Sequence, residues 1–223
     1  MAGVSNLCGV ILAAGDSSRM GTDKALLRWP PAAAGSGFSA QTFLSAAIQS
    51  FDPFSEMVIV VAGQNASNIA PVVYAHGAVL VTNPDPERGQ FSSLQVGLQE
   101  VLNRGRDAAL LTLVDRPPVQ ASTLETLAHQ FSIRAHAIWA VIPEYRGQHG
   151  HPFLIGREMM EAFLKAAPTA NARELEHLNQ AHILYVALED PMITLNIDTP
   201  EDYAALLSSP CPPIPFENGT GRS

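Results

Sequence analysis

Short apolar runs alternate with longer amphipathic segments along this chain. The clearest runs are rich in Val, Ile, Leu and Ala, and they lie at residues 7–14, 57–62, 78–82, 108–114 and 137–142. Weaker runs lie at residues 152–155, 183–188 and 193–196. The first, second and fourth runs are almost continuously apolar, which is typical of strands that are covered on both faces. The pattern therefore predicts a sheet built from these runs, most of them parallel.

The segments between the runs have the pattern of helices. We expect helices at residues 41–50, 92–103, 121–132, 157–166, 172–179 and 201–207. Thr199 followed by Pro200 predicts the start of the last helix, with Thr as N-cap and Pro at the first helical position. The alternation predicts a three-layer, doubly wound α/β fold with a mainly parallel, Rossmann-like sheet. Ligands of such sheets bind at the carboxyl ends of the strands.

The length of 223 residues favours a single domain, which we place at residues 1–208. Residues 209–223 contain four prolines and end in Asn-Gly-Thr-Gly-Arg-Ser, so we expect a disordered tail there. Residues 30–39 are rich in Gly, Pro and Ala and carry no charge, which predicts a surface loop.

Composition narrows the class of function. The chain is 47% hydrophobic and carries a net charge of −8, so it can build a core but is a poor general binder of nucleic acid. A small anionic substrate remains possible where positive charge gathers. No apolar run is long enough to cross a membrane, and we expect no membrane partner. The two cysteines, Cys8 and Cys211, argue against a disulfide framework, so we expect a cytoplasmic protein with Cys8 in its core.

The segment at residues 10–24, VILAAGDSSRMGTDK, runs directly out of the first predicted strand. Gly15 and its small neighbours let a ligand approach the main chain, where free N–H groups can hold phosphate oxygens. Arg19 and Lys24 add two cations suited to a triphosphate. The spacing fits neither a Walker A loop nor GxGxxG. From the residues alone, a phosphate-binding loop and an ordinary turn with two surface cations both remain open.

Asp115 ends the apolar run of LLTLVDRPP, where two prolines follow within three residues. An acid at the carboxyl end of a strand points toward the ligand crevice, and Mg²⁺ prefers one or two carboxylates together with substrate phosphates. Asp115 is therefore a candidate Mg²⁺ ligand, although it could also be a polar residue of the turn. Asp198 in LNIDTPEDY follows another apolar run, and it could simply support the helix cap.

Two further segments carry candidate chemistry. In NPDPERGQFSSLQVGL, Asn83 follows the third run, and Gly89, Ser92 and Ser93 offer N–H and hydroxyl groups that could read a base, unless this is an ordinary loop and N-cap. In YRGQHGHPFL, the two histidines could suggest zinc, but no nearby Cys or acid completes a ligand set. His151 could instead hydrogen-bond a substrate.

LAAGDSSRMGTDK resembles LAAGxSxRMGxxK, the signature loop of nucleotidyltransferases with the nucleotide-diphospho-sugar-transferase fold. This family includes the molybdenum cofactor cytidylyltransferases and guanylyltransferases. The resemblance implies that Arg19 and Lys24 act on the triphosphate. It also implies that the nucleotide is held by the loop and by the Gly/Ser turn, through Leu12, Ala13, Ala14, Gly15, Lys24, Asn83, Gly89, Ser92 and Ser93.

The same resemblance extends to the carboxylates. LVDRP is similar to the family's LVDQP element, whose Asp binds magnesium, with Arg116 in place of Gln. NIDTPEDY is similar to the family's closing DIDTPEDY motif, which makes Asp198 the second Mg²⁺ ligand. Gly-His-Pro at 150–152 looks like an element of the cytidylyltransferase branch that borders the acceptor site, which implies that His151 contacts the acceptor. The GDxGAR element that usually accompanies it is reduced here to Ala-Arg at 172–173.

The resemblance thus implies an Mg²⁺-dependent nucleotidyltransferase. It would transfer a nucleoside monophosphate from an NTP, with CTP favoured, to molybdopterin or the molybdenum cofactor, and release pyrophosphate. A sugar phosphate or other small phosphate as acceptor, and a non-catalytic accessory protein that binds the cofactor, are the alternatives. We expect a monomer or homodimer, with a client molybdoenzyme as a possible further partner.

Overall fold

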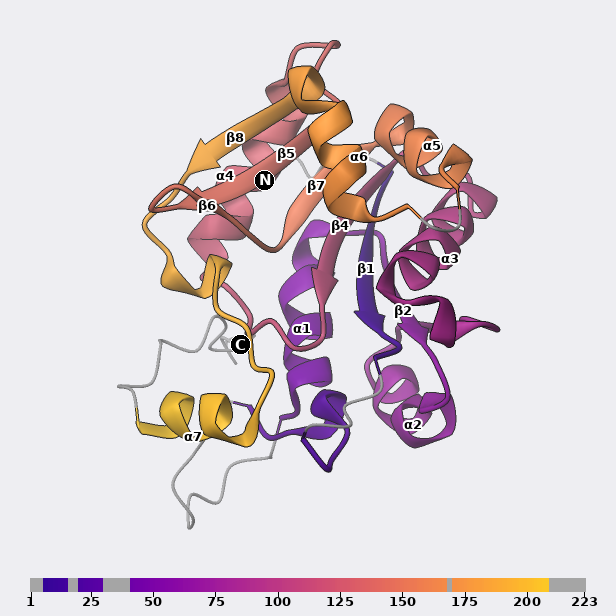
Figure 1. Cartoon of the computed structure of the whole chain (residues 1–223), viewed down its shortest axis with the longest axis vertical. Helices are drawn as coiled ribbons and strands as arrows, with labels where there is room; N and C mark the ends of the chain where they lie inside the picture. Colours follow the sequence, from indigo (N-terminus) through magenta and orange to yellow (C-terminus); the bar gives the residue numbers. More distant parts are fainter. Residues whose placement is uncertain (1–5, 16–19, 30–40, 168–169, 209–223) are drawn as a thin grey trace, which may run out of the picture.

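The structure is a computed structural model that describes residues 6–15, 20–29, 41–167 and 170–208, and these form a mixed sheet between helical layers (Figure 1). The strands are β1 (Leu7–Ala13), β2 (Met57–Ala62), β3 (Val79–Thr82), β4 (Ala108–Leu113), β5 (Ala140–Tyr145), β6 (Gln148–His149), β7 (Phe153–Gly156) and β8 (Ile183–Ala187). Their order is β3-β2-β1-β4-β7-β5-β6, and β8 pairs with β5.

Parallel pairing dominates the half of the sheet that contains β1. There β1 is parallel to both β2 and β4, and β2 is parallel to β3. In the other half β7 runs antiparallel to β4 and β5, β6 runs antiparallel to β5, and β8 is parallel to β5. The predicted α/β class with a mainly parallel, mixed sheet is confirmed.

Alternate side chains of β1 enter two different cores, as the period of a strand requires. Leu7 and Ile11 pack against the helices on one face of the sheet, while Cys8 and Val10 pack against the helices on the opposite face. The helices over the first face are α1 (Phe43–Phe51), α2 (Ala66–Ala75) and α4 (Ala121–Ile133). Those over the second are α3 (Gln90–Asn103), α5 (Arg157–Lys165) and α6 (Ala172–Leu178). Cys8 is fully buried, as predicted.

Helix α2 was not predicted from the sequence. Its residues include Pro71, which removes one helical hydrogen bond and interrupts the expected pattern. Ile69 and Val73 nevertheless lie on one face, four residues apart, and both are fully buried against the sheet. Tertiary packing of this apolar face therefore outweighs the poor local propensity.

The prediction of a strand at residues 193–196 is wrong. Pro191–Ile193 form a short 3-10 helix, and residues 194–198 continue without joining the sheet. The cause lies in buried Asp190, whose carboxylate accepts hydrogen bonds from the N–H groups of Met192 and Gln120 and from the Thr123 hydroxyl. These bonds turn the chain away from the sheet before a ladder can form.

A third, smaller core packs the last helix, α7 (Pro200–Ser208), against α1 and Trp29. Trp29 and Phe43 pack edge to face, with ring centroids 5.3 Å apart, and Ile197 and Leu206 join them. This cluster brings residue 198 toward the sheet. No helix within the described part of the chain is long and apolar enough to cross a bilayer. The predicted loop at 30–39, the predicted tail at 209–223 and Cys211 lie outside the described residues.

Candidate active site

The carboxyl ends of β1 and β4 lie side by side. The predicted nucleotide loop begins there, at the end of β1. Leu12 is in register with Leu113, and its carbonyl accepts a hydrogen bond of 3.0 Å from the Val114 N–H. Leu12 and Ala13 are buried, whereas Ala14 is half-buried and Gly15 is exposed. The chain thus emerges from the sheet at the expected edge. Arg19, the predicted catalytic cation of this loop, lies outside the described residues.

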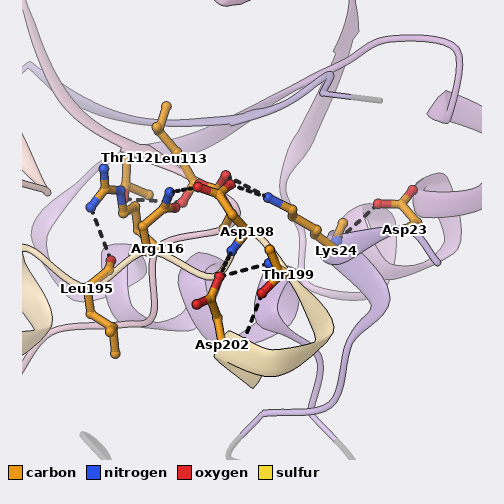
Figure 2. Close-up of polar contacts among 12 residues, drawn as sticks. Asp23, Lys24, Thr112, Leu113, Arg116, Leu195, Asp198, Thr199 and Asp202 are labelled. Atoms are coloured by element: carbon orange, nitrogen blue, oxygen red, sulfur yellow. Dashed lines mark hydrogen bonds and ion pairs between the residues drawn. The ribbon is translucent and has the colours of Figure 1, made fainter. Parts of the chain in front are cut away.

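Three predicted site residues meet at this edge although they are far apart in the sequence, and Figure 2 labels two of them, Lys24 and Asp198. The Lys24 Nζ donates to Asp115 Oδ2 at 3.2 Å and to Asp198 Oδ1 at 2.8 Å. The Ile197 N–H also donates to the Asp115 carbonyl at 3.0 Å, which joins the two carboxylate-bearing segments. Only 12% of the Lys24 side chain is exposed, so water screens these ion pairs less than it screens surface pairs.

Two further side chains, those of Asp23 and Asn65, fix the backbone at Lys24 through hydrogen bonds. Lys24 begins a short 3-10 helix capped by Asp23, whose Oδ1 accepts from the Ala25 N–H at 3.0 Å. Asn65 in turn donates through Nδ2 to Asp23 Oδ2 at 2.8 Å and to the Ala13 carbonyl at 3.0 Å. One amide group therefore joins the two ends of the signature loop.

The sequence analysis missed Asn65 because it belongs to no motif. Its Oδ1 also accepts a hydrogen bond of 3.1 Å from the Gly63 N–H, just after β2. Its position in the sequence could have indicated it, because Asn65 follows a predicted strand by three residues and therefore lies at the same edge of the sheet as the other site residues.

Asp198 is held by the cap of α7. The Asp202 carboxylate accepts from the Asp198 N–H at 2.9 Å and from the Thr199 N–H at 2.8 Å, and the Thr199 hydroxyl accepts from the Asp202 N–H at 3.2 Å. The bond from the Asp198 backbone, followed by that from Thr199, lowers the pKa of Asp202. The predicted Thr199 cap and Pro200 start are confirmed, and Figure 2 shows Thr199 and Asp202 beside Asp198. Asn196 also donates to the Asp198 carboxylate.

The carboxylate pair, which we define as Asp115 and Asp198, has the chemistry of a magnesium site. Asp115 Oδ1 is buried and has no hydrogen-bond partner among the described residues. A cation, the Lys24 ammonium, already lies between the two carboxylates. No cluster of three or more metal-binding side chains exists in the described ranges. The pair therefore fits an ion such as Mg²⁺, which completes its oxygen shell with water and substrate phosphates.

The predicted base-reading turn forms a hydrogen-bonded unit of its own. Buried Asn83 donates through Nδ2 to the hydroxyls of Ser92 at 2.8 Å and Ser93 at 2.9 Å. The Ser92 hydroxyl donates to the Gly89 carbonyl at 2.8 Å. These side chains fix the shape of the turn, while the exposed backbone of Gly89, with φ +91°, remains open to a ligand before α3 begins.

A cavity of about 900 Å³ lies next to this edge, over the sheet and between α3, α5 and α6. Its wall includes Leu12 and Gly89 from the predicted nucleotide site and His151 from the predicted acceptor site. Apolar side chains make up much of the remaining wall, among them Phe91, Leu111, Phe153, Met159 and Phe163. The structure thus brings both predicted sites to one continuous space.

His151 lies in the wall as a neutral ring. Burial, and next the positive charge of Arg116, lower its pKa to about 3, although a hydrogen bond with the Leu111 backbone acts in the opposite direction. Its Nδ1 is enclosed and has no partner within the described part of the chain. The preceding Gly150 packs so closely on the Ile193 carbonyl that a Cβ there would overlap it, and this contact places the histidine.

Arg116, the residue after Asp115, lines the same cavity. Its Nη1 donates to the carbonyls of Thr194 at 3.0 Å and Leu195 at 3.2 Å, and Figure 2 shows the side chain reaching Leu195. Burial lowers its pKa, and the nearby charges of Asp115 and Asp198 oppose this shift. Arg116 therefore holds the segment that leads to Asp198 while it carries positive charge to the cavity.

His149, the other histidine of the segment, lies at the rim of the cavity. Its ring stacks on Tyr185 with centroids 3.9 Å apart, and its Nδ1 lies 3.3 Å from a Glu176 oxygen. Burial, with Glu176 as the next cause, raises the pKa of Tyr185 to about 12. These contacts join β6, β8 and α6 around the cavity mouth.

Comparison with known families gives a match over most of the chain. Residues 9–183 match the family described as MobA-like NTP transferase domain. The molybdenum cofactor cytidylyltransferase of Escherichia coli K12 is 26% identical over 196 residues, which cover 87% of this chain and 92% of that protein. A probable molybdenum cofactor guanylyltransferase of Rhodopirellula baltica is 33% identical over 123 residues, covering 55% of this chain and 54% of that one.

Solved structures share the fold of this chain. The crystal structure of Rv0371c from Mycobacterium tuberculosis superimposes with a TM-score of 0.75 at 28% identity, covering 94% of this chain and 100% of that one. A structure of the same protein in complex with manganese gives a TM-score of 0.69 at 23% identity, covering 92% of this chain and 100% of that one.

Proposed function

The chain belongs to the family of MobA-like NTP transferase domains, and on this premise we propose that it is an Mg²⁺-dependent enzyme that transfers a nucleoside monophosphate from an NTP to a phosphorylated acceptor. The observation that supports this most directly is the meeting of Lys24, Asp115 and Asp198 at the carboxyl ends of β1 and β4. A protein that only binds nucleotide does not require two carboxylates and a lysine at one point.

Asp115 and Asp198 would hold the Mg²⁺ ion. When bound, the ion would supply charge stabilisation to the phosphate oxygens and help to orient them. The unpartnered Asp115 Oδ1 supports this assignment, as does the manganese complex of the similar Mycobacterium tuberculosis protein. Asn196 and the Asp202 cap would keep the Asp198 carboxylate oriented toward Asp115.

The other residues would position the reactants. Ala13, Ala14 and Gly15 would hold the triphosphate through their backbone, and the turn at Gly89 would border the base. Lys24 would exchange its carboxylate partners for phosphate oxygens once the nucleotide is bound. Its ammonium would then neutralise the charge that gathers on the leaving pyrophosphate.

In the reaction itself an oxygen of the acceptor phosphate would attack the α-phosphorus of the NTP. A new P–O bond forms as the bond to the pyrophosphate oxygen breaks in line, and the negative charge leaves with pyrophosphate. An ionised acceptor phosphate needs no strong general base. We place the acceptor in the cavity, in contact with His151.

The curated relatives support molybdopterin or the molybdenum cofactor as the acceptor, with CTP as the favoured nucleotide and GTP as its rival. The alternatives are a sugar phosphate acceptor or a cofactor-binding protein without turnover. Arg19 as a second catalytic cation, a cytoplasmic location, a monomeric or homodimeric state and a client molybdoenzyme remain predictions.

A pyrophosphate-release screen tests the proposal. Each of the four NTPs is combined with molybdopterin and with several sugar phosphates, at saturating Mg²⁺ and after chelation. We expect release with one acceptor class, abolished by chelation and restored by added Mg²⁺. Nucleotide binding by calorimetry without release in any combination would instead favour the accessory protein, and release with sugar phosphates alone would contradict the molybdopterin assignment.

A further inference from the structure

The charges in the cavity wall differ from those of the chain as a whole. The chain carries a net charge of −8. Among the described residues that line the cavity, however, the charged side chains are Arg88, Arg116, Arg173 and Glu176. His151 adds no charge, because its pKa of about 3 leaves the ring neutral near pH 7. The cavity is therefore a locally positive space suited to an anion.

Arg116 differs from the other two arginines in its surroundings. Arg88 and Arg173 are exposed at the rim, where water screens their charge. Arg116 is half-buried, and although the charges of Asp115 and Asp198 act on it, no carboxylate of the described chain lies within ion-pair distance of it. Its partners are two neutral carbonyls, those of Thr194 and Leu195.

The bonding of the Arg116 guanidinium is also incomplete. Nη1 is occupied by the two carbonyls, but Nε is enclosed and lacks a partner within the described ranges. A guanidinium offers five N–H donors, and enclosing such a group without an anion is unfavourable. Arg116 also lines the cavity, so an anion bound there would supply the negative charge that the two carbonyls do not.

We propose that Arg116 binds an anionic group of the acceptor, so that the acceptor is a molecule with negative charge to match this arginine and an apolar body to match the rest of the cavity. This inference rests on the proposed transferase function. Because Arg116 directly follows Asp115, the anion would be held next to the carboxylate pair, where the transfer takes place. The same guanidinium would couple acceptor binding to the segment that carries Asp198.

Steady-state kinetics with Arg116→Gln and Arg116→Lys test the proposal, using the acceptor that supports pyrophosphate release. Arg116→Gln should raise the acceptor KM by about 10- to 100-fold, the effect of losing a hydrogen bond to a charged group. Arg116→Lys, which keeps the charge without the planar fork, should lie between this variant and the wild type. NTP affinity by calorimetry should stay within about twofold. Arg104→Gln, an exposed arginine paired with Glu100, is the matched control.

A second measurement does not depend on turnover. The Nε–H signals of the arginines are followed by NMR while inorganic phosphate is added. We expect the Arg116 signal to shift saturably and the signal of Arg104, which already pairs with Glu100, to stay in place.

The two measurements separate the possible failures. An unchanged acceptor KM together with an unmoved Arg116 signal would overturn the inference while leaving the transferase intact. A loss confined to NTP affinity or Mg²⁺ dependence would also overturn it, since Arg116 would then act only by anchoring residues 194–198. Absence of turnover in the wild type refutes the proposed function instead, and the phosphate titration still tests Arg116.

Discussion

Asp115 and Arg116 are neighbours in the chain, yet they belong to two regions of opposite electrostatic character. Asp115 joins Asp198 and Lys24 in a cluster in which the one ammonium pairs with both carboxylates. Arg116 and His151 line a cavity in which each keeps an enclosed nitrogen without a partner in the described chain.

The difference indicates how each region would meet its ligand. In the Lys24 cluster a ligand must replace an existing ion pair, so binding there is an exchange of partners. In the cavity wall no bond has to be broken first, and a ligand supplies what the protein lacks. Substitutions in the two regions should therefore differ in their effects on metal, nucleotide and acceptor binding.

The largest effect is expected from Asp115→Asn, which removes one charge from the carboxylate pair. The amide is nearly isosteric, so the fold should persist, but turnover should fall by about a thousandfold or more, because a bound metal ion contributes several kcal/mol to charge stabilisation. Pyrophosphate release over a range of Mg²⁺ concentrations measures this. Asp107→Asn, an exposed carboxylate paired with Arg157, is the control. Full activity of Asp115→Asn at low Mg²⁺ would remove Asp115 from the metal site.

Lys24→Ala should lower turnover by about 10²–10³-fold, the scale for losing one electrostatic contact in the transition state. The same change should strengthen the binding of Mn²⁺ in the absence of NTP, because the ammonium no longer competes for Asp115 and Asp198. Calorimetry measures the second effect, with Lys165→Ala, an exposed lysine on α5, as control. Weaker Mn²⁺ binding in Lys24→Ala would show that the ion does not replace the lysine.

His151→Ala should raise the acceptor KM by about 10- to 100-fold, since truncation leaves a buried polar group of the acceptor unpaired. NTP affinity should not change, and parallel titrations of NTP and acceptor test this. His182→Ala, a half-buried ring stacked on Trp139 and absent from the cavity wall, serves as control. If the NTP affinity falls and the acceptor affinity holds, His151 belongs to the nucleotide site.

The smallest effect concerns stability and pH. The pKa of His151 is about 3 in the folded protein, below its ordinary value of 6.5. Between these two pH values the imidazole is protonated in the unfolded chain but neutral in the folded protein. Its contribution to stability is therefore complete above pH 6.5 and is lost as the pH falls toward 3, by at most about 1.4 kcal/mol per pH unit. Urea unfolding at pH 7, 6 and 5 should show a smaller loss in His151→Ala than in the wild type. Equal losses would mean that the ring is not held neutral.

Much of the fold was predictable because the strands and helices have distinct local periods. Leu7 and Cys8 already indicate two cores, since successive residues of a covered strand point to opposite faces. Predictions from the periodicity were wrong or missing where a local sequence signal and the tertiary packing favoured different structures. Pro71 concealed α2, and buried Asp190 turned residues 193–196 away from the sheet that their apolar pattern suggested.

The candidate site divides in the same way. Lys24, Asp115 and Asp198 could be chosen from the sequence, because each lies in a motif at the end of an apolar run. Their meeting within 3.2 Å depends on the pairing of β1 with β4 and on the packing of Ile197 against Phe43 and Trp29. No local pattern encodes these distances.

The tertiary structure alone decided which groups are paired and which are not. Asn65 joins the two ends of the signature loop only because β1 and β2 are adjacent. His151 is neutral, and the Arg116 guanidinium forms no ion pair within the described chain, because packing removes water from both and supplies too few partners in return. Residue types and their spacing determine what chemistry this chain can offer, whereas burial and contact, which depend on the whole fold, determine the state in which each group offers it.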